Sequence, residues 1–416
     1  MATYIWEGGA PPVKQVETFQ VTAYDAATTY TMTIGDQAVS VEGYTDVNTT
    51  ATNLQVALEA STHPYFSTVD WTVTAATVKG TAGVAGVPFT ATASATSGTG
   101  TIGAGTITIV SSGPNNWSTA DNWSANIVPT TGDTWHVEGA TPNICWGLDT
   151  SDTKAVGVIW QSYTGKIGLN SKAFATSSNG ESTQAATDAI PAVYEYRTTA
   201  LDAVTTDIYI GKSNNAGSPT GSGRINLNHT SVTTNTYVYN SAKTASEAGL
   251  APIRINCDQA SSTLNITGGI VGVGQDARDE AVTIADVNMT GGKLFSVCDF
   301  TNMYIDGGTV THEQPSGALT LLEQAGGTVT ISGTQAITTI TARGGTLNLD
   351  STGTVTTLSL YNGAEVDCTA FRFARTITTA TYITGGTLRL HDAKTTITNL
   401  LTTAMDAPHS ITVTKE

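Results

Sequence analysis

The chain has few charged residues and very few basic ones. Asp, Glu, Lys and Arg make up 12% of its 416 residues, about half the usual share. Only 18 residues are Lys or Arg, against 34 Asp or Glu, which gives a formal net charge of −16. An acidic chain without a basic cluster is poorly suited to nucleic acid or to an anionic membrane surface. We therefore expect neither of these partners.

The sequence also lacks long apolar runs, a secretory signal and paired cysteines. No uninterrupted apolar stretch approaches the roughly 18 residues that indicate a membrane-spanning helix. The first residues, MATYIWEGGAPP, contain neither a basic region nor an apolar core, which predicts synthesis and folding in a cytoplasm. The absence of Cys-x-x-Cys spacing predicts buried thiols in a reducing compartment. The cysteines are Cys145, Cys257, Cys298 and Cys368.

Motifs for catalysis and for metal or cofactor binding are absent as well. The chain has no Gly-x-Ser-x-Gly, no phosphate-binding P-loop and no Gly-x-Gly-x-x-Gly that opens a helix. No two of its six histidines have the His-x-x-x-His spacing of a zinc site. We therefore predict no catalytic residue, no bound metal and no cofactor, and we expect that the protein is not an enzyme.

Threonine and glycine dominate what is present. The chain has 78 Thr, nearly one residue in five, and 42 Gly. Thr is β-branched and favours strands. Apolar residues make up 39% and recur in register, whereas disordered chains combine low hydrophobicity with high charge. The composition predicts an all-β protein with very little helix.

A pair of adjacent glycines returns between residues 268 and 386, each time followed by a short alternating strand. A strand-and-corner repeat of this length is typical of a solenoid. Glycine suits the corner because it adopts left-handed backbone angles without strain. The repeat predicts a parallel β-helix with one coil per step. Asn362-Gly363 replaces one of the pairs, and successive pairs lie 16 to 23 residues apart. The second residues of the pairs are Gly269, Gly292, Gly308, Gly327, Gly345, Gly363 and Gly386.

The residues after each corner place apolar side chains on one face, because successive strand side chains point to opposite sides. We predict regular coils over 261–416, preceded by wider, irregular coils with long polar loops over 139–260. The predicted inward pairs are Val329 with Ile331, Leu347 with Leu349, Val366 with Cys368, and Leu388 with Leu390.

The N-terminal third is different, since all seven Trp precede residue 161. Residues 13–112 predict a separate α+β or sandwich domain, inserted into a Trp-rich cap module formed by 1–12 and 113–138. A hairpin is expected around Gly35-Asp36 and a helix in NTTATNLQVALEAS. Strands are expected in VDWTVTAATVKGTAG, VPFTATASA and GTITIVSS. Asn48 or Thr49 is expected to cap the helix, and its apolar face is expected to hold Leu54, Val56, Ala57 and Leu58.

Two groups of motifs resemble parts of tailed-bacteriophage virion proteins. Small domains repeated in phage tail and head proteins have a hairpin, helix and strand similar to Thr31–Gly35, Ala51–Leu58 and Lys79–Thr90. The resemblance covers residues 1–138 and does not distinguish the part of the virion. A module at the start of β-solenoid surface and virion proteins is similar to Tyr4, Ile5, Trp6 and Gly8, followed by Trp117, Asn122, Trp123, Pro129, Gly132 and Asp133.

The resemblance implies a structural protein of a tailed-phage virion, made in the host cytoplasm. Its most concrete form is a capsid decoration (cement) protein or head fibre. Such a protein would be a homotrimer that clamps the major capsid protein, or another virion protein, through many weak contacts. Two alternatives stay open. One is a tail spike or fibre that binds host surface glycan, with or without cleaving it. The other is a bacterial surface adhesin, which the missing signal disfavours.

Several carboxylates are candidate sites, each with a simpler structural interpretation. Asp276 and Asp279, in the run QDARDE, are candidates for a glycan-cleaving pair, and His312-Glu313 is a second candidate. We favour solvated loops for both. Four Asp offer oxygen ligands for Ca²⁺ but have no calcium-loop spacing, so no calcium site is predicted. These are Asp149, Asp152, Asp202 and Asp207.

Two further patterns concern surfaces. Thr-x-Thr pairs such as Thr328/Thr330 and Thr354/Thr356 resemble ice-binding arrays. The drifting repeat length favours ordinary outward strand residues instead. The Trp residues of NNWSTADNWS are candidates for a sugar platform. Aromatic residues at a solenoid end more often form a cap, and we favour the cap.

Overall fold

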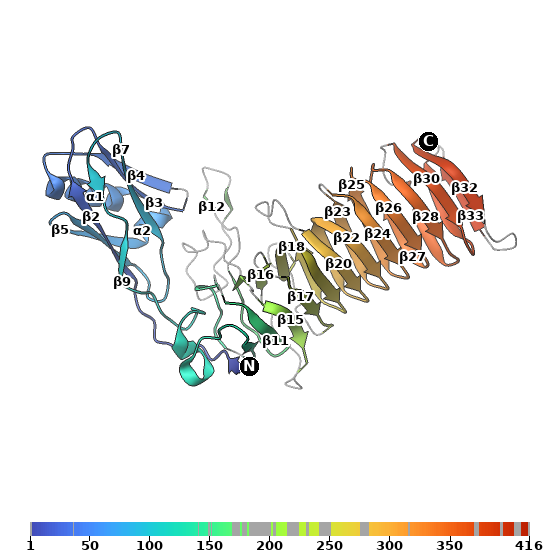
Figure 1. Ribbon diagram of the computed structural model, residues 1–416, viewed down its shortest axis with the longest axis horizontal. Coiled ribbons are helices and arrows are strands. Elements are labelled where there is room, and N and C mark those ends of the chain that lie inside the picture. Colours follow the sequence, from blue (N-terminus) through green and yellow to red (C-terminus); the bar gives the residue numbers. More distant parts are fainter. Residues whose placement is uncertain are drawn as a thin grey trace.

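The computed structural model shows a long β-solenoid with a small separate domain beside its N-terminal end (Figure 1). The predicted all-β class and the parallel β-helix are confirmed. No helix in the described part of the chain is long and apolar enough to cross a membrane. The structure describes residues 2–35, 37–139, 141–148, 150, 152–168, 175–176, 181–182, 201–202, 205–213, 224–229, 233–240, 251–274, 283–314, 317–369, 374–391, 394–402 and 409–414.

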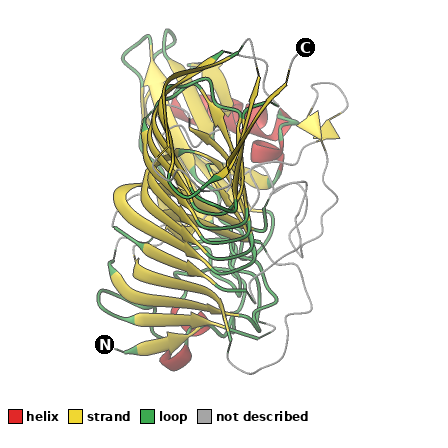
Figure 2. Ribbon diagram, turned by 90° about the vertical axis from the view of Figure 1, so that its right-hand side faces the viewer, coloured by secondary structure: helices red, strands yellow, loops and turns green. Residues whose placement is uncertain are grey.

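Two parallel sheets form the solenoid, and their strands stack coil upon coil (Figure 2). β18 (Ile253–Ile266) passes from the second sheet to the first, so the coils continue across the boundary expected near residue 260. A short antiparallel pair, β12 (Ala175–Thr176) and β13 (Glu181–Ser182), lies outside both sheets.

The two sheets share β18 and have these other members. The first sheet contains β1 (Thr3–Ile5), β10 (Thr134–Val137), β11 (Lys154–Trp160), β15 (Thr205–Lys212), β17 (Asn235–Val238), β20 (Thr283–Met289), β22 (Asp299–Ile305), β24 (Leu319–Gln324), β26 (Ile337–Ala342), β28 (Val355–Leu360), β30 (Arg375–Tyr382) and β32 (Thr395–Thr402). The second sheet contains β14 (Leu201–Asp202), β16 (Ile225–His229), β19 (Ile270–Val273), β21 (Lys293–Val297), β23 (Thr309–Gln314), β25 (Thr328–Gly333), β27 (Gly345–Leu349), β29 (Ala364–Asp367), β31 (Gly386–His391) and β33 (His409–Thr414).

The glycine pairs lie at the corner where the chain passes from the first sheet to the second. The second glycine of each pair has a positive φ, for example +73° at Gly327. The first glycine meets a different requirement, since a Cβ on Gly344 would lie 2.5 Å from the Ala325 carbonyl oxygen of the preceding coil. The corners stack this closely because they are hydrogen-bonded, as from the Thr328 N–H to the Gly308 carbonyl at 2.9 Å. Glycine is therefore needed both for the dihedral angle and for the close approach.

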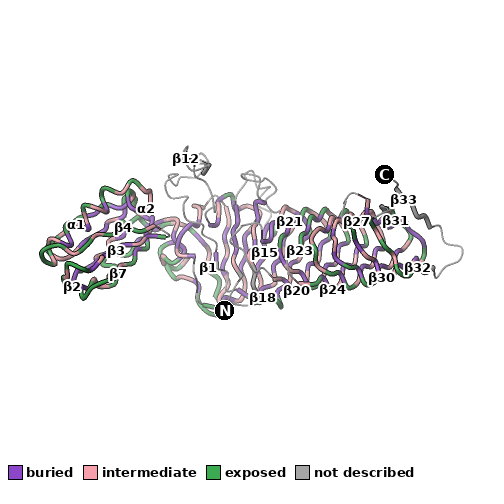
Figure 3. The backbone as a smooth tube through the Cα atoms, turned by 90° about the horizontal axis from the view of Figure 1, so that it is seen from above, coloured by how far each residue is buried: buried purple, intermediate pink, exposed green. Residues whose placement is uncertain are grey.

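The inward side chains form one continuous core. Buried residues recur along the length of the solenoid in Figure 3. The predicted inward pairs are buried, except that Leu390 is only partly buried. One inward row of the first sheet ends at Leu400 of the last coil, which is 47% exposed. The seven members before it, from Leu264 onward, are at most 1% exposed: Leu264, Val287, Met303, Leu322, Ile340, Leu358 and Ala380. Three cysteines have buried thiols that are not in a disulfide, as predicted, and the side chain of the fourth lies outside the described residues. The buried ones are Cys145, Cys298 and Cys368.

Four buried tryptophans close the N-terminal end of this core. Their ring centroids lie 4.5 to 6.5 Å apart in stacked and edge-to-face pairs, arrangements that stabilise aromatic clusters. Asn122, in the 3-10 turn Ala120–Asn122, links residues 1–12 to residues 113–138 of the cap module. Its side-chain amide donates to the Gly113 and Asn116 carbonyls, and its side-chain oxygen accepts from the Ala10 N–H at 2.8 Å. The tryptophans are Trp6, Trp117, Trp123 and Trp135.

Residues 13–112 have a core of their own, built from two antiparallel sheets. One sheet has the order β5-β6-β2-β8, with β9 also paired to β2, and the other has the order β4-β3-β7. The Val13 N–H donates to the Ser112 carbonyl at 2.7 Å, so the two ends of this segment lie side by side. Its elements are β2 (Val16–Ala23), β3 (Thr29–Ile34), β4 (Gln37–Glu42), α1 (Val47–Ala60), α2 (Pro64–Ser67), β5 (Val69–Thr74), β6 (Thr77–Ala82), β7 (Ala91–Thr96), β8 (Thr101–Ile102) and β9 (Thr106–Ile109).

The helix α1 corrects two expectations about this domain. The prediction that Asn48 or Thr49 caps it is wrong, because the helix begins at residue 47 and Asp46 precedes it. The Asp46 carboxylate accepts hydrogen bonds from the N–H groups of Asn48 and Thr49, at 2.8 and 2.9 Å. Val56 is 56% exposed, so it does not belong to the buried face that contains Leu58.

The domain contains two hairpin turns, one of them predicted and the other not. The hairpin expected around Gly35-Asp36 is confirmed, since β3 and β4 pair up to Ile34 opposite Gln37. The segment VDWTVTAATVKGTAG, expected as one strand, is instead a hairpin of β5 and β6. Its turn contains Ala75 with a φ of +50°. Nothing in the local sequence signals this turn, because alanine is an uncommon residue at positive φ.

Candidate binding surface

The solvated loop favoured for His312 and Glu313 is wrong, because both residues lie in the strand β23 and point to opposite sides of it. His312 is buried, with Nδ1 2.9 Å from the Ser296 Oγ and Nε2 2.7 Å from the Gln314 Oε1. Its ring stacks on Phe300 at 4.8 Å. Burial lowers the pKa of His312 to about 4, although the hydrogen bond to Gln314 opposes this, so the ring is neutral at pH 7. A serine and histidine enclosed in a core cannot meet a substrate, and exposed Glu313 cannot assist them.

The predicted carboxylate candidates do not converge within the described residues. Asp152 is exposed on a turn, and Asp207 lies on the outer face of β15, where its Oδ1 accepts from the Asn235 side chain at 2.9 Å. Throughout the described residues, no group of three or more His, Cys, Asp or Glu could hold a metal ion. The side chains of the remaining candidates lie outside the described residues: Asp149, Asp202, Asp276 and Asp279.

The threonine pairs on the second sheet form only short rows. Thr328 is followed by Thr346 in the next coil and then by Glu365. Thr330 is followed by Asn348, whose side-chain amide donates to the Thr330 hydroxyl at 3.1 Å. These rows favour ordinary outward strand residues over a long, regular threonine array. The tryptophans of NNWSTADNWS are buried in the cap and cannot act as a sugar platform.

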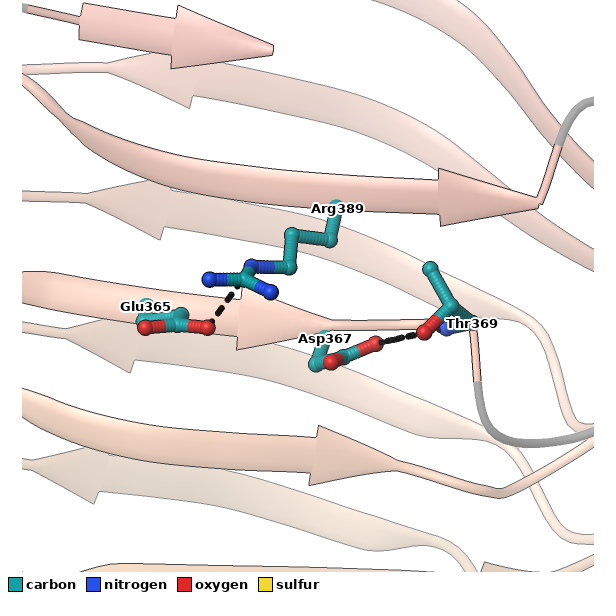
Figure 4. A network of polar contacts seen from close by, with 4 residues as sticks. All are labelled: Glu365, Asp367, Thr369 and Arg389. Carbon is teal, nitrogen blue, oxygen red and sulfur yellow. Dashed lines mark hydrogen bonds and ion pairs between the residues drawn. The ribbon is translucent and has the colours of Figure 1, made fainter. Parts of the chain in front are cut away.

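Further along the second sheet the outer face is charged (Figure 4). Arg389 of β31 pairs with Glu365 of β29, with 2.8 Å between Nε and Oε1. Asp367 accepts from the Thr369 N–H and hydroxyl at 2.7 and 2.6 Å. The Arg389–Glu365 pair is partly exposed, so it contributes at most about 1 kcal/mol. It joins adjacent coils but forms no enclosed site.

A cluster of aromatic side chains lies on the outer face of the first sheet, close to the capped end. We name it the aromatic surface. Val158 lies in the same outward row, between His136 and Tyr209, and is only 4% exposed, which shows that the larger side chains cover it. The aromatic surface comprises His136, Trp160, Tyr209, Lys212, Tyr237 and Tyr239.

The strand register builds this surface. Tyr209 and Tyr237 are direct neighbours in adjacent coils, and their rings stack at 4.8 Å with planes 10° apart. The Lys212 ammonium lies 5.0 Å from the Tyr209 ring centre and 5.8 Å from that of Trp160. Cation–π contacts of this kind stabilise by about 0.5–1 kcal/mol at exposed sites. The rings are therefore held in place, with none of them fully buried.

The electrostatics leave the aromatic surface largely neutral. Burial raises the pKa of Tyr209 and Tyr237, and the nearby Asp207 carboxylate raises both further. Burial lowers the pKa of His136, although Glu138 opposes this effect. At pH 7 Tyr209 and Tyr237 keep their hydroxyl protons and the His136 imidazole is neutral. The surface thus offers hydroxyl donors, one cation and the adjacent Asp207–Asn235 pair, groups suited to reversible binding.

Sequence reasoning missed this surface. The segments TDIYIGK and TNTYVYN lie in the region of irregular coils, and nothing local marks their tyrosines as neighbours. Asp207 and Tyr209 lie 28 residues before Asn235 and Tyr237, their partners in the next coil, but this spacing has a meaning only once the strand register is known. No protein-family model, curated protein or solved structure matches the chain.

Proposed function

We propose that this protein is a non-enzymatic structural component of a tailed-phage virion, in the form of a capsid decoration protein or head fibre. It would attach to the major capsid protein, or to another virion protein, through the aromatic surface. The solenoid would serve as a stiff support that projects from the particle or lies against it.

The observation that carries this proposal is the aromatic surface on a rigid sheet. Tyrosine and tryptophan are enriched at protein interfaces, because one part of the ring is apolar and the other can hydrogen-bond. A surface of ordered rings also loses little side-chain entropy when a partner binds. The motifs of residues 1–138 support the virion context, and the short threonine and charged rows elsewhere support no competing site.

Labelled antibody against the chain, imaged on purified particles by negative staining, tests the location. We expect label over the head. The surface itself is tested by re-adding purified chain to particles that lack it. Tyr209→Ala with Tyr237→Ala should reduce attachment at least tenfold, about 1.4 kcal/mol. Tyr304→Ala is the matched control, since Tyr304 lies in the same outward row three coils beyond Tyr237. Equal attachment by the double variant and the control would refute the role of this surface.

A tail spike or fibre that binds host surface glycan is the second candidate. The observation that favours it is the hydrogen-bonded Asp207–Asn235 pair next to Tyr209 and Tyr237, since carboxylate, amide and aromatic groups together bind sugars. Label at the tail tip would support this candidate. Release of reducing ends from host polysaccharide, lost in Asp276→Asn or Asp279→Asn, would add cleavage and overturn the non-enzymatic proposal.

A further inference from the structure

One corner of the solenoid differs from its neighbours in sequence and in geometry. Asn362 takes the place of the first glycine. At the preceding corners the N–H after the pair donates to the previous corner, but the Ala364 N–H donates to Tyr361 of its own turn at 3.1 Å. A Cβ on Gly363 would meet nothing nearer than the Arg343 carbonyl oxygen at 4.0 Å, whereas at the four preceding corners a carbonyl lies 2.4 to 2.7 Å away. At Gly363 the chain therefore lies farther from the preceding corner than it does at the other corners, which leaves room for the asparagine side chain.

The same geometry exposes a reactive pair of groups. Asn362 and Gly363 are both exposed, and Gly363 has a φ of +94° as the third residue of the turn. Within the described structure, neither the Gly363 N–H nor the Asn362 side-chain amide makes a hydrogen bond. The Asn362 N–H is anchored to the Thr384 hydroxyl at 3.1 Å. An unbonded amide nitrogen thus follows an unbonded side-chain amide, and no Cβ on residue 363 shields it.

We propose that Asn362 is a site of spontaneous deamidation. The Gly363 nitrogen attacks the Asn362 Cγ, so that an N–Cγ bond forms and the Cγ–Nδ2 bond breaks. The amide proton leaves with the departing ammonia, and a five-membered succinimide remains. Water then opens the ring at either carbonyl, which yields aspartate or isoaspartate. The reaction needs only water and involves no oxidation or reduction.

The product changes this corner in two ways. Either form adds one negative charge to a chain whose net charge is already −16. Isoaspartate also inserts one more carbon into the main chain beside Tyr361, whose ring lies 4.6 Å from the Arg343 guanidinium. A strict Gly-Gly corner has no room for that insertion, whereas at Gly363 the nearest atom to a new Cβ is the Arg343 carbonyl oxygen of the preceding coil, at 4.0 Å.

Peptide mapping by mass spectrometry tests the proposal. The intact chain is incubated at mildly alkaline pH, with a urea-unfolded sample as reference, until Asn362 in the reference has reacted. We expect the folded chain to react within about tenfold of the reference rate and to give two isomeric products. Asn348, whose amide is bonded to Thr330, should remain unmodified in the folded chain.

A variant at residue 362 tests whether the modification arises at this corner or elsewhere in the chain. Asn362→Gln should abolish the reaction at this position without altering the circular dichroism spectrum, because the longer side chain closes its ring far more slowly. An Asn362 peptide that stays intact in the folded chain, while the unfolded reference has reacted, would overturn the proposal, since it would mean that the corner protects this residue.

Discussion

The two requirements at the glycine corners can be separated by three substitutions. Gly363→Ala violates only the dihedral requirement, since φ is +94° and the nearest atom to a new Cβ is 4.0 Å away. Gly344→Ala violates only the close approach, because its Cβ would lie 2.5 Å from the Ala325 oxygen while its φ is outside the left-handed region. Gly327→Ala violates both, with a φ of +73° and a Cβ 2.5 Å from the Gly308 oxygen.

The expected losses follow from these geometries. A left-handed alanine costs about 1–2 kcal/mol, and forcing apart a close-packed contact costs about 1–3 kcal/mol. Gly363→Ala should show only the first loss and Gly344→Ala only the second. Gly327→Ala should show roughly their sum, about 2–5 kcal/mol. Urea unfolding followed by far-UV circular dichroism measures all three. If Gly327→Ala is no less stable than Gly363→Ala, the close approach of the corners does not constrain the sequence and the reasoning fails.

Three further predictions concern the inserted domain, a buried histidine and the assembly. Excising residues 13–112 with a short linker should leave a soluble, β-rich remainder. The reason is that the Val13 N–H and the Ser112 carbonyl are hydrogen-bonded at 2.7 Å, so the flanking residues that a linker must join lie close together. Aggregation of the remainder, with an excised domain that cannot fold alone, would contradict this. The folded pKa of His312, about 4, lies below its ordinary value of 6.5. The contribution of the neutral ring to the free energy of unfolding is therefore fully present above pH 6.5, and about 3 kcal/mol should be lost as pH drops through 4. His312→Gln should flatten the dependence of the urea midpoint on pH between 6.5 and 4, and an unchanged slope in this variant would contradict the role of His312. Light scattering should give a trimer whose attachment to particles weakens in high salt, given the charge of −16; a monomer at micromolar concentration with salt-insensitive attachment would refute both statements.

The solenoid was predictable because one short pattern fixes several features at once. A glycine pair marks the corner, and the alternation after it assigns Val329 and Ile331 to the core. The start of α1 was not predictable to the residue, since Asp46, Asn48 and Thr49 are all good capping residues. Only the extended backbone of Asp46 selects it. Local sequence thus fixes the repeat but leaves choices between equivalent neighbours to the three-dimensional structure.

The aromatic surface was out of reach for a different reason. Its members come from coils of irregular length, so no visible repeat aligns Tyr209 with Tyr237. Their contact depends on the strand register, which is set by burial of neighbouring residues such as Ile208 and Val238 on the opposite face. A surface assembled in this way becomes visible only once the coils are stacked.

Because the coils stack, the number of coils between two residues determines their distance along the solenoid. Each coil contacts only its neighbours, and each adds one strand spacing of about 4.8 Å to the length of the rod. The number of coils therefore acts as a ruler between the aromatic surface and the last coil, where Leu400 is half exposed. Removing one whole coil, from one glycine corner to the next, would shorten that distance by a single step and leave the tryptophan cap and the aromatic surface unchanged.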